Sequence, residues 1–203
     1  MTQEALARAK AAFEIEAREV LRAREVMNME AFARAVDALK AAPRIGASGC
    51  GHSGIACRHF AHLMCCIERP ARFISPAEAV HGASGFLQKG DAMVLVSRGG
   101  KTAELLPIAR IALEKGAVVI ALTEALDSPL AQLSDIVLPM KVERETDRYN
   151  SQGTSSFAAT NAVFDALQAA LIEETGFRNE QFARIHPGGA VGDRLNAGKA
   201  KGR

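Results

Sequence analysis

Residues 92–104 read Ala-Met-Val-Leu-Val-Ser-Arg-Gly-Gly-Lys-Thr-Ala-Glu, and this stretch decides the fold. Its first part, 93–96, is a short apolar run with two valines, which is typical of a strand buried on both faces. The run ends in a glycine-containing loop with hydroxyls at Ser97 and Thr102, and a helical pattern of apolar residues follows from Leu105. A strand, such a loop and a helix start together present free backbone N–H groups to an anion.

Two cations in the same loop strengthen this interpretation. Arg98 and Lys101 add positive charge to the hydroxyl donors, and Gly100 lies between them. The alternative is an ordinary strand-to-helix turn, since short glycine motifs often occur without a ligand. The loop favours an anion site over that alternative.

Strand and helix patterns alternate along the chain. Strands are predicted at 44–49, 71–74, 93–96, 117–122 and 135–139. Helices are predicted at 55–66, from Leu105 to Leu113, near 129–133 and at 155–176, with a short helical piece at 177–183. Residues 75–86 are expected to connect elements, and 184–192 to be irregular. This alternation predicts an α/β fold, a parallel sheet with helices on both faces.

Two amphipathic helices are expected ahead of the first strand, over 2–27 and 29–41. One stripe of the first helix has the spacing of a helix face, with Leu6, Ala9, Phe13, Ala17, Val20 and Arg24. These helices cover either the chain's own sheet or another subunit, and the sequence leaves both open.

Composition limits the function classes. The chain has 203 residues, 48% of them hydrophobic, which is enough for one domain with a full core. Its 25 basic and 23 acidic residues give a net charge of +2, which argues against a nucleic-acid partner. Four cysteines without C-x-x-C spacing favour a reducing cytoplasm over disulfides. Neither a signal peptide nor a membrane-spanning run is visible, so we expect a cytoplasmic protein without a membrane partner.

Polar loops follow several predicted strands, where a parallel sheet of this type binds its ligands. One is the glycine loop at 48–54, another is the Ser97 loop, and the third is a helix start at Thr154, Ser155 and Ser156. Hydroxyls at a helix start are usually capping residues. Together with the Ser97 loop they instead suggest a cradle for one phosphate.

Four residues could carry acid–base chemistry. His52, His81 and His186 lie in glycine-containing irregular segments, and Glu145 lies in a charged run. Each alone could be an ordinary surface side chain, but gathered at one sheet edge they could move a proton next to a carbonyl. The histidines lack the close spacing of a metal site, so we expect no metal. His59 and His62 lie in an apolar helix, and we interpret both as structural.

Five motifs carry a resemblance to a known family: GCGHSG at 49–54, AEAVHG at 77–82, SRGGKTAE at 97–104, TSS at 154–156 and HPGGAVG at 186–192. In order and spacing the chain resembles sugar isomerase (SIS) domains over about 44–195, and most closely the arabinose-5-phosphate isomerase branch. The resemblance implies a three-layer αβα sandwich with a five-stranded parallel sheet of the flavodoxin-like, doubly wound type. It also implies a homo-oligomer, a dimer of dimers, whose active sites are shared between subunits.

The resemblance further implies an aldose–ketose isomerase that acts on a phosphorylated sugar through an enediol, without a cofactor. The expected organisation is N-terminal helices at 1–43, the SIS domain at 44–195 and a disordered basic tail at 196–203. Members of this branch often carry a pair of CBS domains, and this chain resembles the SIS-only form.

Site residues carry over by motif. The residues expected to bind the phosphate are Ser97, Arg98, Gly100, Thr102, Thr154, Ser155 and Ser156. The residues expected in the substrate loop are Gly51, Ser53 and Lys101. The expected catalytic residues are His186, His81, Glu145 and His52, with His186 as the base and His81 or His52 assisting ring opening.

The chain departs from the family pattern at several positions. His52 replaces a lysine, Gly99 a serine, Lys101 a glutamate and Ala83 an aspartate. One hypothesis is that Lys101 compensates for the lysine that His52 replaces. The alternative is that the two changes mark a different sugar. These changes also keep open a non-catalytic phosphosugar sensor. A dinucleotide-binding domain fits less well, because no acidic residue ends the second predicted strand at Ile74.

Overall fold

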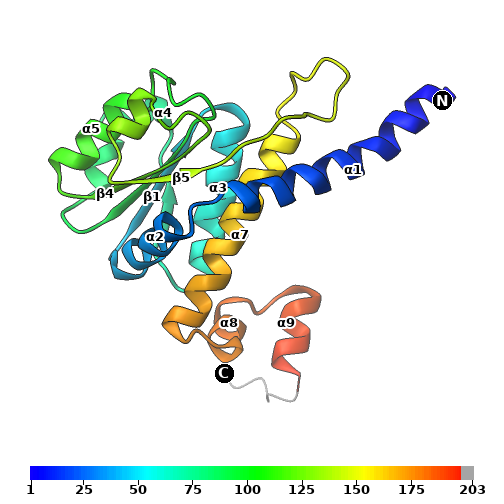
Figure 1. Cartoon of the computed structure of the whole chain (residues 1–203). Coiled ribbons are helices and arrows are strands. Elements are labelled where there is room, and N and C mark those ends of the chain that lie inside the picture. The colour runs from blue at the N-terminus through cyan, green and yellow to red at the C-terminus, as the bar shows by residue number, and fades with distance from the viewer. Residues whose placement is uncertain (198–203) are drawn as a thin grey trace.

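The computed structural model describes residues 1–197 and contains a five-stranded parallel sheet (Figure 1). The strands are β1 (Ile45–Gly49), β2 (Ala71–Phe73), β3 (Ala92–Val96), β4 (Val118–Thr123) and β5 (Ile136–Pro139). Their order is β2-β1-β3-β4-β5, which is the doubly wound order of flavodoxin-like folds. The predicted fold class is therefore confirmed, and each predicted strand is present with its ends shifted by a residue or so.

The helices flank the sheet or precede it. Their bounds are α1 (Gln3–Val26), α2 (Met29–Ala41), α3 (Gly51–Cys66), α4 (Pro76–Ala79), α5 (Leu106–Glu114), α6 (Pro129–Gln132), α7 (Ser155–Thr175), α8 (Asn179–Ile185) and α9 (Gly189–Asn196), with a short 3-10 helix η1 (Ala83–Phe86). No described helix is both long and apolar enough to cross a bilayer.

The central strand β3 shows why the fold has three layers. Val94 and Val96 pack into the core formed with α2, α3 and α7, whereas Met93 and Leu95 pack into the core formed with α5 and α6. Successive side chains of a strand point to opposite faces, so a continuous apolar run requires helices on both sides. Phe60 of α3 and Phe164 of α7 fill one layer, with ring centroids 4.5 Å apart.

The register of the strands aligns the ends that matter for function. Gly49 of β1 pairs with Val96 of β3, and Val96 pairs with Leu122 of β4. The loops that follow these strands therefore leave the sheet side by side at its carboxyl edge.

Several local predictions were wrong. Helix α3 begins at Gly51 rather than at residue 55, α4 and η1 lie in the expected connection, and α9 occupies part of the segment expected to be irregular. Gly188 and Gly189 lower the helix propensity where α9 begins, and Gly189 has φ of +72°, so the start of this helix was not predicted. The basic tail was expected from residue 196, but Asn196 ends α9 and residues 198–203 lie outside the described residues.

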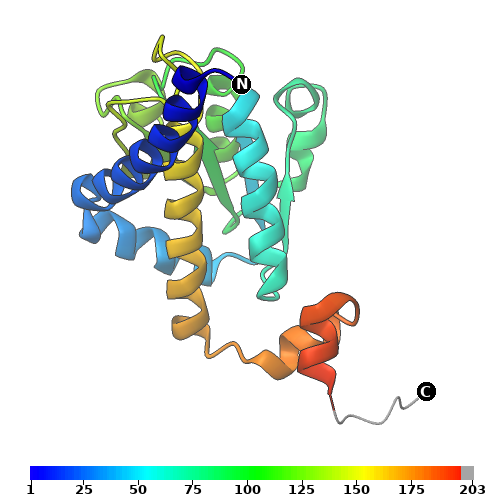
Figure 2. The same ribbon diagram turned by 90° about the vertical axis from the view of Figure 1, so that its right-hand side faces the viewer.

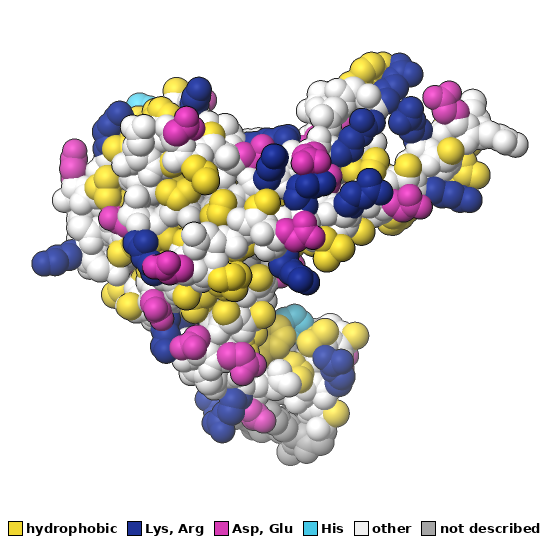
Figure 3. Space-filling view, viewed as in Figure 1, with side chains coloured by type: hydrophobic (Ala, Val, Ile, Leu, Met, Phe, Trp, Pro, Cys, Tyr) yellow, Lys and Arg dark blue, Asp and Glu magenta, His cyan; other side chains and the backbone are white. Residues whose placement is uncertain are grey.

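Two further expectations about burial differ from the structure. His59 and His62 are exposed on α3 rather than packed in the core. The N-terminal part of α1 projects away from the sheet, and Phe13 is 79% exposed (Figures 1 and 3). Only Glu19 and Ala23 of α1 are buried, so most of its predicted stripe does not cover the chain's own core.

Candidate functional site

Four segments meet at the carboxyl edge of the sheet around a small cavity. Its walls come from the start of α3, the end of β3, the end of β5 and the start of α7, and its lining residues are His52, Ser53, Val96, Arg98, Met140, Ser156, Phe157 and Thr160. The ring of His52 lies edge-on to that of Phe157, with centroids 6.0 Å apart. Four of the predicted site residues, His52, Ser53, Arg98 and Ser156, are thus brought together.

The loop after β3 is a closed turn. The hydroxyls of Ser97 and Thr102 lie 2.8 Å apart, and the Gly100 N–H donates to the Ser97 carbonyl over 3.1 Å. The Leu130 N–H donates to the Gly100 carbonyl over 3.0 Å, which ties the loop to α6. Lys101 is exposed on this loop. Two adjacent hydroxyls beside an exposed cation can bind a phosphate.

Arg98 pairs with groups of the folded chain outside its own loop. Its Nη1 donates to Glu145 Oε1 over 2.9 Å and its Nη2 donates to the Val142 carbonyl over 2.9 Å. Its Nε lies 2.9 Å from Glu124 Oε1. The guanidinium therefore joins the β3 loop to the segment between β5 and α7.

Glu145 is a carboxylate that is only 1% exposed. Its Oε1 accepts from Arg98, and its Oε2 accepts hydrogen bonds of 3.2 Å from the Thr154 hydroxyl and from the Ser156 N–H. A carboxylate at the start of a helix is stabilised by unpaired N–H groups and by the helix dipole. Glu145 thus occupies the N-terminus of α7, where the three hydroxyls were expected to bind phosphate.

Ser155 has a different environment from its neighbours. The residue is fully buried, and its hydroxyl has no hydrogen-bond partner among the described residues. Of the three hydroxyl residues at this helix start, two contact Glu145 and the third points into the protein.

The turn from β1 into α3 depends on glycines. A Cβ atom on Gly54 would lie 2.5 Å from the Gly49 carbonyl oxygen, so these two positions have no room for a side chain. Gly51 has φ of +55°, which a glycine adopts without strain. This close turn brings the start of α3, with His52 and Ser53, to the sheet edge.

A second cleft of about 570 Å³ opens beside this turn. Cys50, Gly51, Arg58 and Glu104 are among its lining residues. Burial, and then the negative charge of Glu104, raise the pKa of the Cys50 thiol. Glu104 had no predicted role, although it is the first carboxylate after the Ser97 loop and lies within residues 92–104.

His81 and His186 do not join the cavity in the same chain. His81 is exposed in the turn after α4 and lines neither opening. His186 ends α8, with its ring 4.9 Å from that of Phe182. Helix α7 has 21 residues, and at 1.5 Å per residue it is about 30 Å long.

Figure 2 shows α8 and α9 at the far end of α7 from its N-terminus. Within one chain, the structure therefore does not bring His186 to the edge that carries His52 and Glu145. For His186 the reason is that α7 begins at the carboxyl edge of the sheet and carries the chain away from it.

Other features of the described residues limit what the site can hold. Among them, no group of three His, Cys, Asp or Glu side chains could hold a metal ion.

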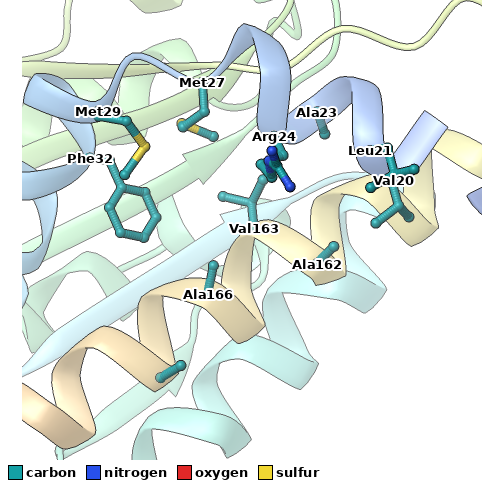
Figure 4. Close-up of a pocket in the computed structure, with 11 residues that line it drawn as sticks. Val20, Leu21, Ala23, Arg24, Met27, Met29, Phe32, Ala162, Val163 and Ala166 are labelled. Atoms are coloured by element: carbon teal, nitrogen blue, oxygen red, sulfur yellow. The ribbon is translucent and has the colours of Figure 1, made fainter. Parts of the chain in front are cut away.

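An apolar groove of about 460 Å³ lies between the helix pair α1–α2 and the middle of α7 (Figure 4). Met27, Met29 and Phe32 line one side and Ala162 and Ala166 the other, so this groove does not suit a phosphorylated ligand.

Comparison with protein families gives a match to the SIS domain over residues 38–170. Among curated proteins, the chain is 37% identical over 152 residues to the arabinose 5-phosphate isomerase KdsD of Pseudomonas aeruginosa, covering 75% of this chain and 47% of that protein. It is 40% identical over 149 residues to the arabinose 5-phosphate isomerase GutQ of Salmonella typhimurium, covering 73% and 46% respectively. The chain thus spans about half the length of the curated relatives it matches.

Solved structures give similar matches over nearly the whole chain. A proposed sugar-phosphate isomerase from Listeria monocytogenes has a TM-score of 0.89 and 39% identity, and the match covers 93% of this chain and all of that one. An Escherichia coli CFT073 protein solved in complex with A5P has a TM-score of 0.84 and 27% identity, with 92% of this chain and all of that one covered.

Proposed function

The chain belongs to the SIS domain family, and on that premise we propose that it is a sugar-phosphate isomerase that interconverts an aldose phosphate and a ketose phosphate through an enediol. The observation that carries the proposal is the buried Glu145 carboxylate, which lies beside the Ser97 loop and the His52 cavity. Isomerisation needs such a group to move a proton between neighbouring carbons, next to a site that holds the phosphate.

Arabinose 5-phosphate and ribulose 5-phosphate are the substrates to test first. The two curated relatives are named arabinose 5-phosphate isomerases, and one similar structure contains A5P. The phosphate would bind the hydroxyls of Ser97 and Thr102, with Lys101 as the cation and the Gly51–Ser53 turn facing the sugar. Binding energy from the phosphate, which does not react, then positions the reacting carbons.

The acid–base groups come from more than one copy of the chain in this proposal. Glu145 and His52 belong to one copy, whereas His186 reaches the same site only from a second copy, because α7 separates the two within a chain. The exposed stripe on α1 and the apolar groove beside α7 support an assembly. His81 is also exposed and is available for ring opening.

Mixing two inactive variants tests the sharing of the site. Glu145→Gln and His186→Ala should each lose turnover. When the two are mixed, unfolded together and refolded, random association should restore about a quarter of the sites, since each such site takes one intact residue from each copy. The absence of restored activity, with assembly intact, would contradict the shared site.

The reaction itself is tested by proton NMR in deuterated water with five-, six- and seven-carbon aldose and ketose phosphates. An enediol mechanism should form the partner sugar and exchange the proton beside the carbonyl with solvent. Replacement of the family glutamate by Lys101 favours a sensor as the second candidate, and binding without exchange or conversion would support that function instead.

The location proposed for this activity is the cytoplasm. All four cysteines are free thiols, and Cys57 is completely buried, so none forms a disulfide in the structure. This agrees with a reducing compartment.

A further inference from the structure

Arg98 contacts three acceptors on two segments. Glu124 follows β4 and pairs with Arg98 Nε over 2.9 Å, while Glu145 and the Val142 carbonyl, between β5 and α7, accept hydrogen bonds of 2.9 Å from Nη1 and Nη2. A guanidinium is planar and carries its donors in a fixed fork, so three acceptors determine its position and orientation.

The segment that carries Glu145 is held at successive backbone positions. The Val142 N–H donates to Glu124 over 3.0 Å, and the Glu143 N–H donates to the buried Glu19 of α1 over 2.9 Å. The Glu145 N–H donates to Asn150 Oδ1 over 2.6 Å. Side chains from three parts of the chain therefore fix the backbone, and Arg98 then fixes the carboxylate.

We propose that Arg98 is a positioning residue that holds the Glu145 carboxylate against the N-terminus of α7, and that Lys101 is the phosphate-binding cation of the β3 loop. The catalytic role in this inference rests on the proposed function, whereas the contacts of Arg98 do not depend on that function. It assigns different tasks to the two cations of one short loop.

Existing ion pairs, rather than exposure, support this division, since both side chains are exposed. A phosphate bound by Arg98 would place its negative charge beside the Glu124 and Glu145 carboxylates that already pair with this guanidinium. Lys101 is exposed and makes no ion pair among the residues that the structure describes. Lys101 and the hydroxyls of Ser97 and Thr102 can therefore bind a phosphate without breaking an ion pair among the described residues.

The two cations should differ in kinetics. Arg98→Met leaves Glu145 buried without its cation, so the carboxylate moves from its place at the start of α7. We expect kcat to fall by about tenfold or more, with KM for arabinose 5-phosphate within about twofold, because a small displacement of a catalytic group affects the chemical step. Lys101→Met should instead raise KM by about tenfold, the loss of one charge-assisted hydrogen bond, with kcat little changed.

Arg98→Lys is the conservative variant. A single ammonium group cannot span three acceptors, so it should restore only part of kcat. Glu124→Gln, which removes the negative charge of one partner but keeps its shape, should act in the same direction with a smaller effect and is available if Arg98→Met does not fold.

Two measurements test the inference even if the protein turns over none of these sugars, an outcome that would reject the proposed function alone. The first is calorimetric titration with inorganic phosphate and arabinose 5-phosphate. Arg98→Met should retain the wild-type affinity, and Lys101→Met should lose about tenfold. The second is hydrogen exchange at the Ser156 and Val142 amides, which should accelerate in Arg98→Met and stay unchanged in Lys101→Met.

The inference is overturned if Arg98→Met weakens ligand affinity as much as Lys101→Met while kcat and amide exchange stay at wild-type values. It is equally overturned if Arg98→Met leaves exchange at Ser156 unchanged, because Glu145 would then not depend on Arg98 for its place.

Discussion

Gly100 lies so close to Ser128 that a Cβ atom on Gly100 would overlap the Ser128 hydroxyl. Gly100 has φ of +61°, a left-handed conformation that favours glycine. Ser128 is the N-cap of α6, and its Oγ accepts the Ala131 N–H over 3.3 Å. The β3 loop and the start of α6 therefore pack together without space for a side chain.

Gly100→Ala should lower the free energy of unfolding by about 2–4 kcal/mol, because the methyl group strains the backbone and displaces the α6 cap. Urea denaturation measures the change. Gly99→Ala is the matched control, since a Cβ there meets no atom within 4 Å, and its effect should stay within about 0.5 kcal/mol. Equal effects of the two variants would contradict the close packing.

Asp91→Ala should destabilise the fold by about 3 kcal/mol, since it removes a buried carboxylate that pairs with Arg44 and leaves polar groups without partners. Asp91 is fully buried, lies 2.9 Å from Arg44 Nη2 and accepts the Gln88 N–H over 2.7 Å. Asp37→Ala, at an exposed position of α2, is the control and should change stability little. Thermal denaturation compares the two.

Glu104→Gln should speed alkylation of Cys50 a few-fold at a fixed pH near 8. Burial and the Glu104 charge both raise the pKa of this thiol, so removal of the charge lowers the pKa and increases the thiolate fraction. Mass spectrometry of the Cys50 peptide after timed iodoacetamide treatment measures the rate. Glu114→Gln on α5 is the control, and a Cys50 rate unaffected by Glu104→Gln would mean that the two side chains do not face one another.

Cys57 should resist alkylation in the same experiment. It is completely buried and its Sγ donates to the Ser48 carbonyl over 3.2 Å, and burial raises the pKa of the thiol strongly. Its modification should therefore follow global unfolding and increase only with added denaturant. Rapid modification of Cys57 in the native protein would show that α3 opens locally.

Phe13→Glu should dissociate the proposed oligomer without lowering the stability of the single chain. Phe13 lies on the projecting part of α1 and is 79% exposed, so a single chain loses little packing when it is replaced. Analytical ultracentrifugation of the variant and of Glu14→Gln, an exposed neighbour, compares their assembly. An unchanged sedimentation coefficient for Phe13→Glu would place the interface elsewhere.

The sheet could be predicted because its signal is local. Runs such as 93–96 are apolar on both faces, and only a strand between two helical layers buries both. The helix α9 could not be predicted in this way, because Gly188 and Gly189 lower the helix propensity at the place where it begins. Burial of α1 also escaped prediction, since an apolar stripe does not tell which surface it contacts.

The site was predictable only in part. The Ser97 loop and the start of α7 each have a local signature, and the doubly wound order brings them to one edge. The partners of Arg98 have no local sequence signature, because Val142 and Glu145 lie 44 and 47 residues further along the chain and meet Arg98 only in the folded protein. A cation in a glycine loop therefore looked like a phosphate ligand, although its acceptors are carboxylates and a carbonyl.

The length of α7 has a consequence for how the rate depends on protein concentration. A single chain holds Glu145 and His186 at opposite ends of a helix about 30 Å long and cannot use both on one sugar molecule. Under the shared-site proposal, dilution below the dissociation constant of the assembly lowers the activity per milligram, whereas excess substrate or crowding that favours the assembly restores it. Because α7 separates the two residues, the activity per milligram of enzyme would rise with the concentration of the enzyme.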